Sequence, residues 1–110
     1  SLEHNKQEIV CVASEGNRLV GLCCGQIFKS MCYSVPYGEI TELYVSEKYR
    51  RLNVASGLMA FIETAFHKHG INYYQLFTGK SNIAAQAFYQ SLGYVDTPEM
   101  MFRKQPKDGV

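Results

Sequence analysis

The stretch YRRLNVASG, residues 49–57, separates two runs of different hydrophobic period. Before it, EITELYVS (39–46) alternates well enough to predict a β-strand. After it, apolar residues recur on one helical face, at Ala55, Leu58, Met59, Ile62, Ala65 and Phe66. The order of strand, basic turn and helix predicts a crossover unit in which the turn leads directly into a helix N-terminus.

This basic turn has features of a phosphate-binding loop, although it lacks the usual glycines. A helix N-terminus presents unpaired N–H groups and a partial positive charge, which together favour anions. Arg50 and Arg51 add cationic groups, and Asn53 is the non-glycine residue that best tolerates a left-handed backbone. Ala55 is small enough for a close approach, and Ser56 supplies a hydroxyl. The alternative is a solvated basic turn, and this stretch alone does not decide between them.

The remaining segments predict a single α/β domain over residues 1–110. Two apolar runs joined by EGNR (15–18) indicate a hairpin, and Gly70 and Gly93 follow the last periodic residues of two helices. The second helix begins at Ser81 or Asn82 and ends at Leu92. The expected strands are residues 8–14, 19–28, 39–46, 72–78 and 100–104. The middle strand–helix–strand unit should be a parallel crossover.

The composition excludes several classes of protein. Eleven Lys and Arg against ten Asp and Glu give a net charge of +1, which disfavours a nucleic-acid or membrane-surface binder. The apolar runs are too short to span a bilayer, and no signal peptide is visible. No Cys-x-x-Cys pair occurs and the two histidines of the first helix point to different sides, so we expect no metal site. The four cysteines, Cys11, Cys23, Cys24 and Cys32, are expected as free, mostly buried thiols of a cytoplasmic protein.

The segment SNIAAQAFYQSLGY (81–94) supplies a second motif. With it, the chain resembles the GNAT superfamily of acetyl-CoA-dependent N-acetyltransferases. In that family a strand ending in a Leu-x-Val-type run leads to Gln/Arg-x-x-Gly-x-Gly/Ala, which here is LYV (43–45) and then residues 50–55. The later family signature is matched by Asn82, Ala85, Phe88, Tyr89, Gly93 and Tyr94. The two motifs in this order, over about residues 9–104, are far more specific than either alone.

The resemblance implies a mixed, mostly antiparallel sheet whose central parallel pair splays to admit acetyl-CoA, with flanking helices. Asn53 replaces the first loop glycine, a change that costs about 1 kcal/mol if the residue is left-handed. The family begins with a strand and one or two helices for which only SLEHNKQE (1–8) stands here, so we expect those elements to be missing. The first strand would then be an exposed edge that invites pairing with another chain, such as a homodimer partner.

The family resemblance also implies roles for individual residues. Acetyl-CoA would be the cosubstrate, an amine would attack its thioester directly, and no metal is expected to take part. The backbone of Leu43, Tyr44 and Val45 would pair with the pantetheine arm. Asn82 would hydrogen-bond that arm further along, with a plain helix cap as the alternative. The other cofactor-binding residues implied are Arg50, Arg51, Leu52, Asn53, Val54, Ala55, Ser56, Ala85 and Phe88.

Two residues are candidates for proton transfer. Tyr89 would protonate the departing thiolate, since a phenol with a pKa near 10 matches a thiol leaving group, whereas the alternative is a core aromatic. Glu42 is the candidate general base; being three residues from Glu39, it should face the opposite side of the strand. The acceptor would be a primary amine, favoured here as a cationic small molecule of aminoglycoside or polyamine type. A protein amine, or a non-catalytic module that binds acetyl-CoA, remains the alternative.

Overall fold

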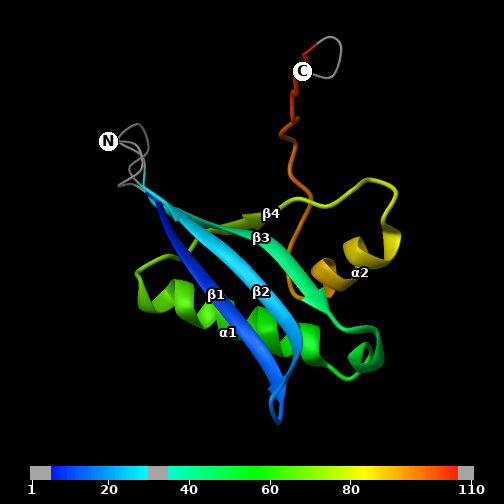
Figure 1. The fold of residues 1–110 in the computed structure, drawn as a ribbon. Coiled ribbons are helices and arrows are strands. Elements are labelled where there is room, and N and C mark those ends of the chain that lie inside the picture. Colours follow the sequence, from blue (N-terminus) through cyan, green and yellow to red (C-terminus); the bar gives the residue numbers. More distant parts are fainter. Residues whose placement is uncertain (1–5, 30–34, 107–110) are drawn as a thin grey trace.

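A computed structural model, which describes residues 6–29 and 35–106, contains a four-stranded mixed sheet with helices packed against it (Figure 1). The strands lie in the order β1-β2-β3-β4; the first three are antiparallel and β4 is parallel to β3. This confirms the predicted mixed, mostly antiparallel fold. In chain order the elements are β1 (Lys6–Glu15), β2 (Arg18–Phe28), β3 (Tyr37–Val45), the 3-10 turn η2 (Glu47–Tyr49), α1 (Val54–Lys68), β4 (Tyr74–Leu76) and α2 (Ile83–Ser91).

The predicted final strand at residues 100–104 is wrong. These residues are exposed and form no ladder with any described strand, and Figure 1 shows this segment leading away from the sheet. An apolar run becomes a strand only where a neighbouring backbone accepts its hydrogen bonds, and local sequence does not supply that neighbour. For the same reason the predicted fourth strand, 72–78, shortens to Tyr74–Leu76.

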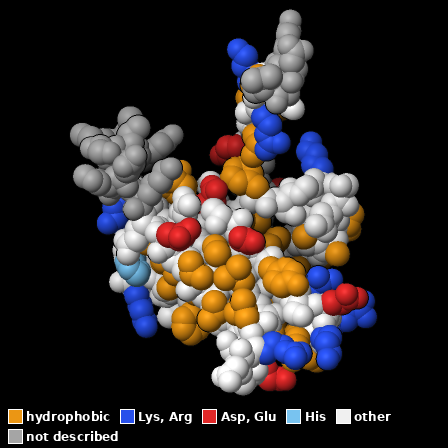
Figure 2. Space-filling view, viewed as in Figure 1, with side chains coloured by type: hydrophobic (Ala, Val, Ile, Leu, Met, Phe, Trp, Pro, Cys, Tyr) orange, Lys and Arg blue, Asp and Glu red, His pale blue; other side chains and the backbone are white. Residues whose placement is uncertain are grey.

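The two faces of the sheet differ in their cover. On the inner face, Cys11 and Cys23 are paired across β1 and β2 and are buried beneath α1. On the outer face, Val10 and Val12 are 54% and 58% exposed. Figure 2 shows hydrophobic side chains gathered on the face where β1 and β2 lie in front of α1. The core therefore lies on one side of the sheet only, between the sheet and α1.

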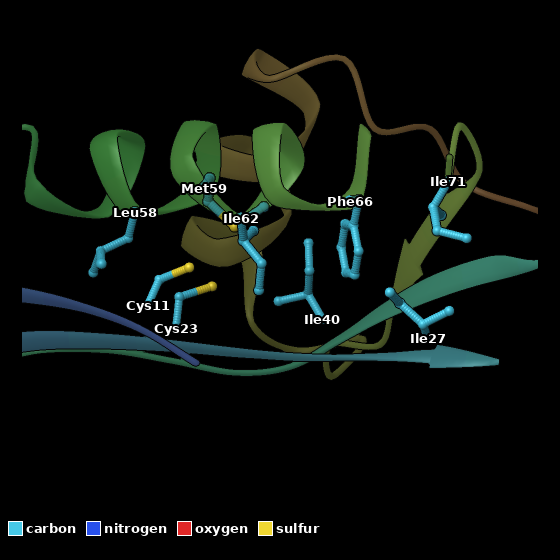
Figure 3. Close-up of a cluster of buried hydrophobic side chains, with 9 residues drawn as sticks. All are labelled: Cys11, Cys23, Ile27, Ile40, Leu58, Met59, Ile62, Phe66 and Ile71. Carbon is cyan, nitrogen blue, oxygen red and sulfur yellow. The ribbon is translucent and has the colours of Figure 1, made fainter. Parts of the chain in front are cut away.

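The Phe66 side chain of α1 packs against the sheet at two glycine positions, Gly25 and Gly38. Its ring is fully buried, and a Cβ added at Gly38 would lie 2.7 Å from Cε1 of Phe66. A Cβ added at Gly25 would lie 2.8 Å from Cζ of Phe66 and from Cδ1 of Ile62. Figure 3 shows these side chains projecting from α1 toward the strands. The absence of side chains at the two glycines thus sets how closely α1 approaches β2 and β3.

The C-terminus of α1 turns the chain back into this core. Gly70 has φ 77°, its N–H donates to the carbonyl of His67 at 2.9 Å, and the N–H of Ile71 donates to that of Phe66 at 2.9 Å. This is the left-handed glycine cap that the sequence predicts. Ile71 is fully buried, so the turn anchors the approach to β4. Neither helix in residues 6–29 and 35–106 is long and apolar enough to cross a bilayer.

We predict that Gly38→Ala destabilises the protein by about 1–3 kcal/mol, because the new methyl group overpacks against the Phe66 ring. The matched control is Gly57→Ala in α1, where a Cβ meets nothing within 4 Å. Removing a glycine from this exposed helical position should stabilise by about 0.5–1 kcal/mol. Urea unfolding followed by circular dichroism measures both changes; equal effects of the two substitutions would contradict the packing argument.

Candidate functional site

The parallel pair of strands opens after three residues. β3 pairs with β4 only from Gly38 to Ile40, opposite Tyr74–Leu76, whereas β3 continues to Val45. Beyond Ile40, no described strand lies along the β4 side of β3. The peptide groups of residues 41–45 that point away from β2 can therefore hydrogen-bond an extended ligand. The splay expected of this pair is confirmed, and Leu43, Tyr44 and Val45 lie in the open part.

The turn between β3 and α1 contains two left-handed residues. Asn53 has φ 64° and ψ 16°, as its substitution for glycine requires, and Arg51 has φ 67°, which the sequence did not reveal. Left-handed residues in a turn aim backbone N–H groups into a shared concavity that suits anions. Asn53 is also the N-cap of α1, and its side chain makes no capping hydrogen bond. The first N–H groups of α1 therefore remain available to a phosphate.

A cavity of about 310 Å³ lies between this turn and the end of β3. Its lining brings together most of the predicted cofactor residues: Val45, Arg50, Arg51, Asn53, Val54, Ala55, Ser56 and Phe88. Tyr49, which the sequence did not single out, also lines it, while Leu52 is 61% exposed and does not. Arg50 folds back, its Nε donating to the Val45 carbonyl at 3.1 Å. That carbonyl is thus engaged by Arg50, which fixes the turn to the end of β3.

At the start of α2, Asn82 is the helix cap, the alternative to its role as a cofactor ligand. Its Oδ1 accepts the N–H of Ala85 at 3.1 Å, which caps the helix. Only the amide NH₂ group of Asn82 is left to donate to a ligand. Neither Asn82 nor Ala85 lines the cavity at the turn. The cap positions Phe88, one helical turn further along α2, beside that cavity.

Tyr89 is both a packed aromatic and a residue at a cavity. Its ring contacts that of Phe88 at a centroid distance of 5.3 Å. It also lines a second, larger cavity, of about 870 Å³, between β4 and α2. Desolvation, with a smaller contribution from Cys23, raises the pKa of the Tyr89 phenol above its ordinary value. The hydroxyl therefore keeps its proton at neutral pH and can donate it, as a general acid must.

The prediction that Glu39 and Glu42 face opposite sides of their strand is wrong. The register of β2 with β3 shifts between Cys24 and Gly25, so that Cys24 pairs with Glu42 and Gln26 pairs with Glu39. Paired residues share a face, and Cys24 and Gln26 are two apart, so both glutamates lie on the outer face of the sheet. Thr41 is the extra, unpaired residue of this irregularity in β3. Because of it, Glu39 and Glu42 face the same side of the sheet although they are three residues apart.

Two of the cysteines are sealed in the core, as free thiols. Cys11 and Cys23 are 4% and 0% exposed, and desolvation raises the pKa of Cys23 to about 12. Cys24 is half-buried on the outer face, where desolvation and then Glu42 raise its pKa. These shifts disfavour the thiolate that nucleophilic catalysis would need. Cys32 lies outside the described residues, among which no group of His, Cys, Asp or Glu is arranged to hold a metal ion.

Solved structures share this arrangement of strands and helices. An aminoglycoside acetyltransferase from an uncultured soil metagenomic sample matches with a TM-score of 0.81 at 20% identity, over 91% of this chain and 66% of its own. The acetyltransferase AAC(6')-Iy, in complex with a bisubstrate analogue of CoA, matches with a TM-score of 0.78 at 20% identity, over 90% and 69%. A transcriptional regulator from Bacillus halodurans C-125 matches at 0.81 and 21% identity, over 94% and 69%. At such identities the likeness establishes the fold.

The fold and the site define a mixed-sheet domain in which a parallel strand pair opens beside the N-terminus of α1. The model of the acetyltransferase (GNAT) family matches residues 1–94, and the chain belongs to that family. It spans 66% of the length of the soil-metagenome aminoglycoside acetyltransferase.

We predict that Asn53→Gly preserves stability to within about 1 kcal/mol, because glycine adopts the left-handed conformation without strain. Asn53→Val should lose more than about 1–2 kcal/mol, because a β-branched side chain is a poor fit there. Urea unfolding measures stability, and calorimetric titration measures the affinity of each variant for CoA. Equal CoA affinity and stability for the two variants would contradict the role of the left-handed turn.

Proposed function

We propose that this chain is the acetyl-CoA-binding and acetyl-transferring domain of an N-acetyltransferase. The observation that carries the proposal is the coincidence of three features: the open edge of β3 after Ile40, the left-handed turn 51–53 at the start of α1, and Tyr89 on α2. Each feature matches one part of acetyl-CoA. The open edge matches the extended, amide-bearing arm, the turn matches the pyrophosphate, and Tyr89 matches the thioester, which needs a proton donor.

The cofactor would lie along the open edge with its phosphates at the turn. The pantetheine amides would pair with the peptide groups of Leu43 and Tyr44, in place of a fourth long strand. The pyrophosphate would accept hydrogen bonds from the backbone N–H groups of residues 53–56, and the guanidinium of Arg51 would balance its charge. Arg50 is committed to the Val45 carbonyl and so shapes the turn instead. Several donors fixed in place by backbone bind a phosphate without a reorganisation cost.

The reaction requires one bond to form and one to break. The neutral amine attacks the thioester carbon, so that a C–N bond forms, and the C–S bond then breaks to release a thiolate. Tyr89 would give its proton to that sulfur, for which the raised pKa of its phenol keeps the proton in place. The surplus proton on the nitrogen would pass, directly or through water, to a carboxylate. Glu42 is the candidate, now joined by Glu39 on the same face.

The acceptor is proposed as a cationic amine. Glu39 and Glu42 share the outer face with Glu8, which pairs with Gln26 across β1 and β2. Figure 2 shows acidic side chains beside the hydrophobic patch on this face. A polyamine or an aminoglycoside presents positive charges that these carboxylates would attract, and several of the fold neighbours are aminoglycoside acetyltransferases. A protein amine remains the alternative acceptor.

The test of this proposal begins with binding and continues with transfer. Acetyl-CoA should raise the melting temperature of the chain, because a ligand of the folded state stabilises it by mass action. Release of free CoA thiol should then appear with amines from a panel of polyamines, aminoglycosides and lysine peptides. Stabilisation without transfer to any of these amines would favour a non-catalytic acetyl-CoA-binding module. Absence of stabilisation at millimolar acetyl-CoA would contradict the proposal.

We predict that Tyr89→Phe lowers kcat by about 10²-fold or more while acetyl-CoA affinity is retained, since the proton donor is lost and the ring remains. In the wild type, the alkaline decline of kcat should begin only above the ordinary phenol pKa, because desolvation raises the pKa of Tyr89, and this decline should vanish in the variant. The matched control is Tyr37→Phe, at the far end of β3, whose ring stacks on Phe28 at 5.2 Å. Equal kcat for Tyr89→Phe and the wild type, with chemistry rate-limiting, would contradict the assignment of Tyr89 as the proton donor.

A further inference from the structure

Tyr94 is held in a fixed relation to Tyr89 by the turn that ends α2. Its N–H donates to the carbonyl of Tyr89 at 3.1 Å, while the N–H of Gly93 donates to that of Gln90 at 3.0 Å. Gly93 has φ 97°, so the two bonds form the double-bonded glycine cap common at helix ends. The two tyrosine rings meet edge to face at a centroid distance of 6.1 Å. Tyr94 and Tyr89 are therefore linked through both the backbone and their rings.

The hydroxyl of Tyr94 ties this turn to α1. It donates to Oε2 of Glu63 at 2.7 Å in a part-buried setting. Desolvation, followed by this hydrogen bond, raises the pKa of Tyr94 far above its ordinary value, so that it remains a phenol and a donor. A short bond from a hydroxyl to a carboxylate in such surroundings is stronger than one between neutral partners. It joins the end of α2 to the helix whose N-terminus forms the phosphate turn.

Tyr94 also contacts β4. Its ring lies 6.3 Å, centroid to centroid, from that of Tyr74, and the Tyr74 ring stacks on Phe66 at 5.5 Å. One side chain thus touches both helices and one of the two splayed strands: α1 through Glu63, α2 through Tyr89 and β4 through Tyr74. Tyr94 and Glu63 both line the larger cavity beside Tyr89.

We propose that Tyr94 and Glu63 are positioning residues, which set the distance of the Tyr89 hydroxyl from the thioester sulfur. This inference rests on the proposed function. Proton donation in the transition state depends on placement, and a misplacement of about 1 Å can cost about 10²-fold in rate. Because the phosphate turn belongs to α1 and the proton donor to α2, the Glu63–Tyr94 bond couples the two ends of the bound cofactor. Neither residue needs to touch the substrate.

The experiment compares four variants for kcat and for acetyl-CoA Kd. Tyr94→Phe and Glu63→Leu each break the bond, and each should lower kcat about 10- to 10²-fold with Kd changed less than about twofold. Glu63→Gln keeps a carbonyl acceptor for the Tyr94 hydroxyl and should retain most of the activity. Combining Tyr94→Phe with Glu63→Leu should lower kcat no further than either change alone, because both remove one interaction.

Thr64→Val is the matched control on α1. It removes a hydrogen bond to the carbonyl of Ala60, inside the helix, and should leave kcat unchanged. Wild-type kcat in Tyr94→Phe, an additive loss in the double variant, or a loss confined to acetyl-CoA affinity would overturn the positioning role. If Tyr94→Phe fails to fold, the contrast between Glu63→Gln and Glu63→Leu decides. Failure of the proposed function is distinguishable, because then the wild type itself binds no acetyl-CoA or transfers nothing, and the inference falls with it.

Discussion

The packing of Phe66 against Gly25 and Gly38 sets the position of α1 on the sheet, and with it the position of the candidate site. Because Gly25 and Gly38 have no Cβ, the Phe66 ring packs directly on the sheet, and α1 lies close to β2 and β3. A similar approach occurs at the other end of α1, where a Cβ on Gly21 would lie 2.9 Å from Leu58. The helix is thus fixed at both ends, and its N-terminus is held at the carboxyl end of β3. Full burial contributes about 1.5–3 kcal/mol for each of the several large apolar side chains of this core, and their sum exceeds the cost of about 1–2 kcal/mol for each of the two left-handed residues in the turn.

The candidate site arises from places where regular structure stops. β4 leaves β3 after Ile40, which frees peptide groups that a longer strand would have covered. An extra residue in β3, at Thr41, brings Glu39 and Glu42 to one face. The turn before α1 contains two left-handed residues, and its N-cap residue Asn53 makes no side-chain capping hydrogen bond. Each irregularity would weaken a purely structural sheet, and all three lie around the same opening.

The parts of this arrangement that local sequence determines were predictable. The hairpin of β1 and β2, the helical face of α1 and the glycine after each helix depend on neighbours along the chain, and the structure confirms all of them. The left-handed Asn53 was predictable from its substitution for glycine, but Arg51 was not, because nothing in an arginine indicates that conformation. The bulge at Thr41 and the unpaired segment 100–104 depend on a partner strand, so a single strand's sequence could not reveal them. The Tyr94–Glu63 bond joins residues 31 apart and was invisible for the same reason.

We propose that the open edge of β3 and the left-handed turn form one continuous site for acetyl-CoA. Backbone amide shifts in ¹H–¹⁵N spectra, recorded during titration with acetyl-CoA, test it residue by residue. We expect saturable shifts that are largest in residues 41–45 and 51–56, with a smaller response at Tyr89 and Tyr94. Shifts confined to the outer face of β1, or no saturable shift at all, would contradict it.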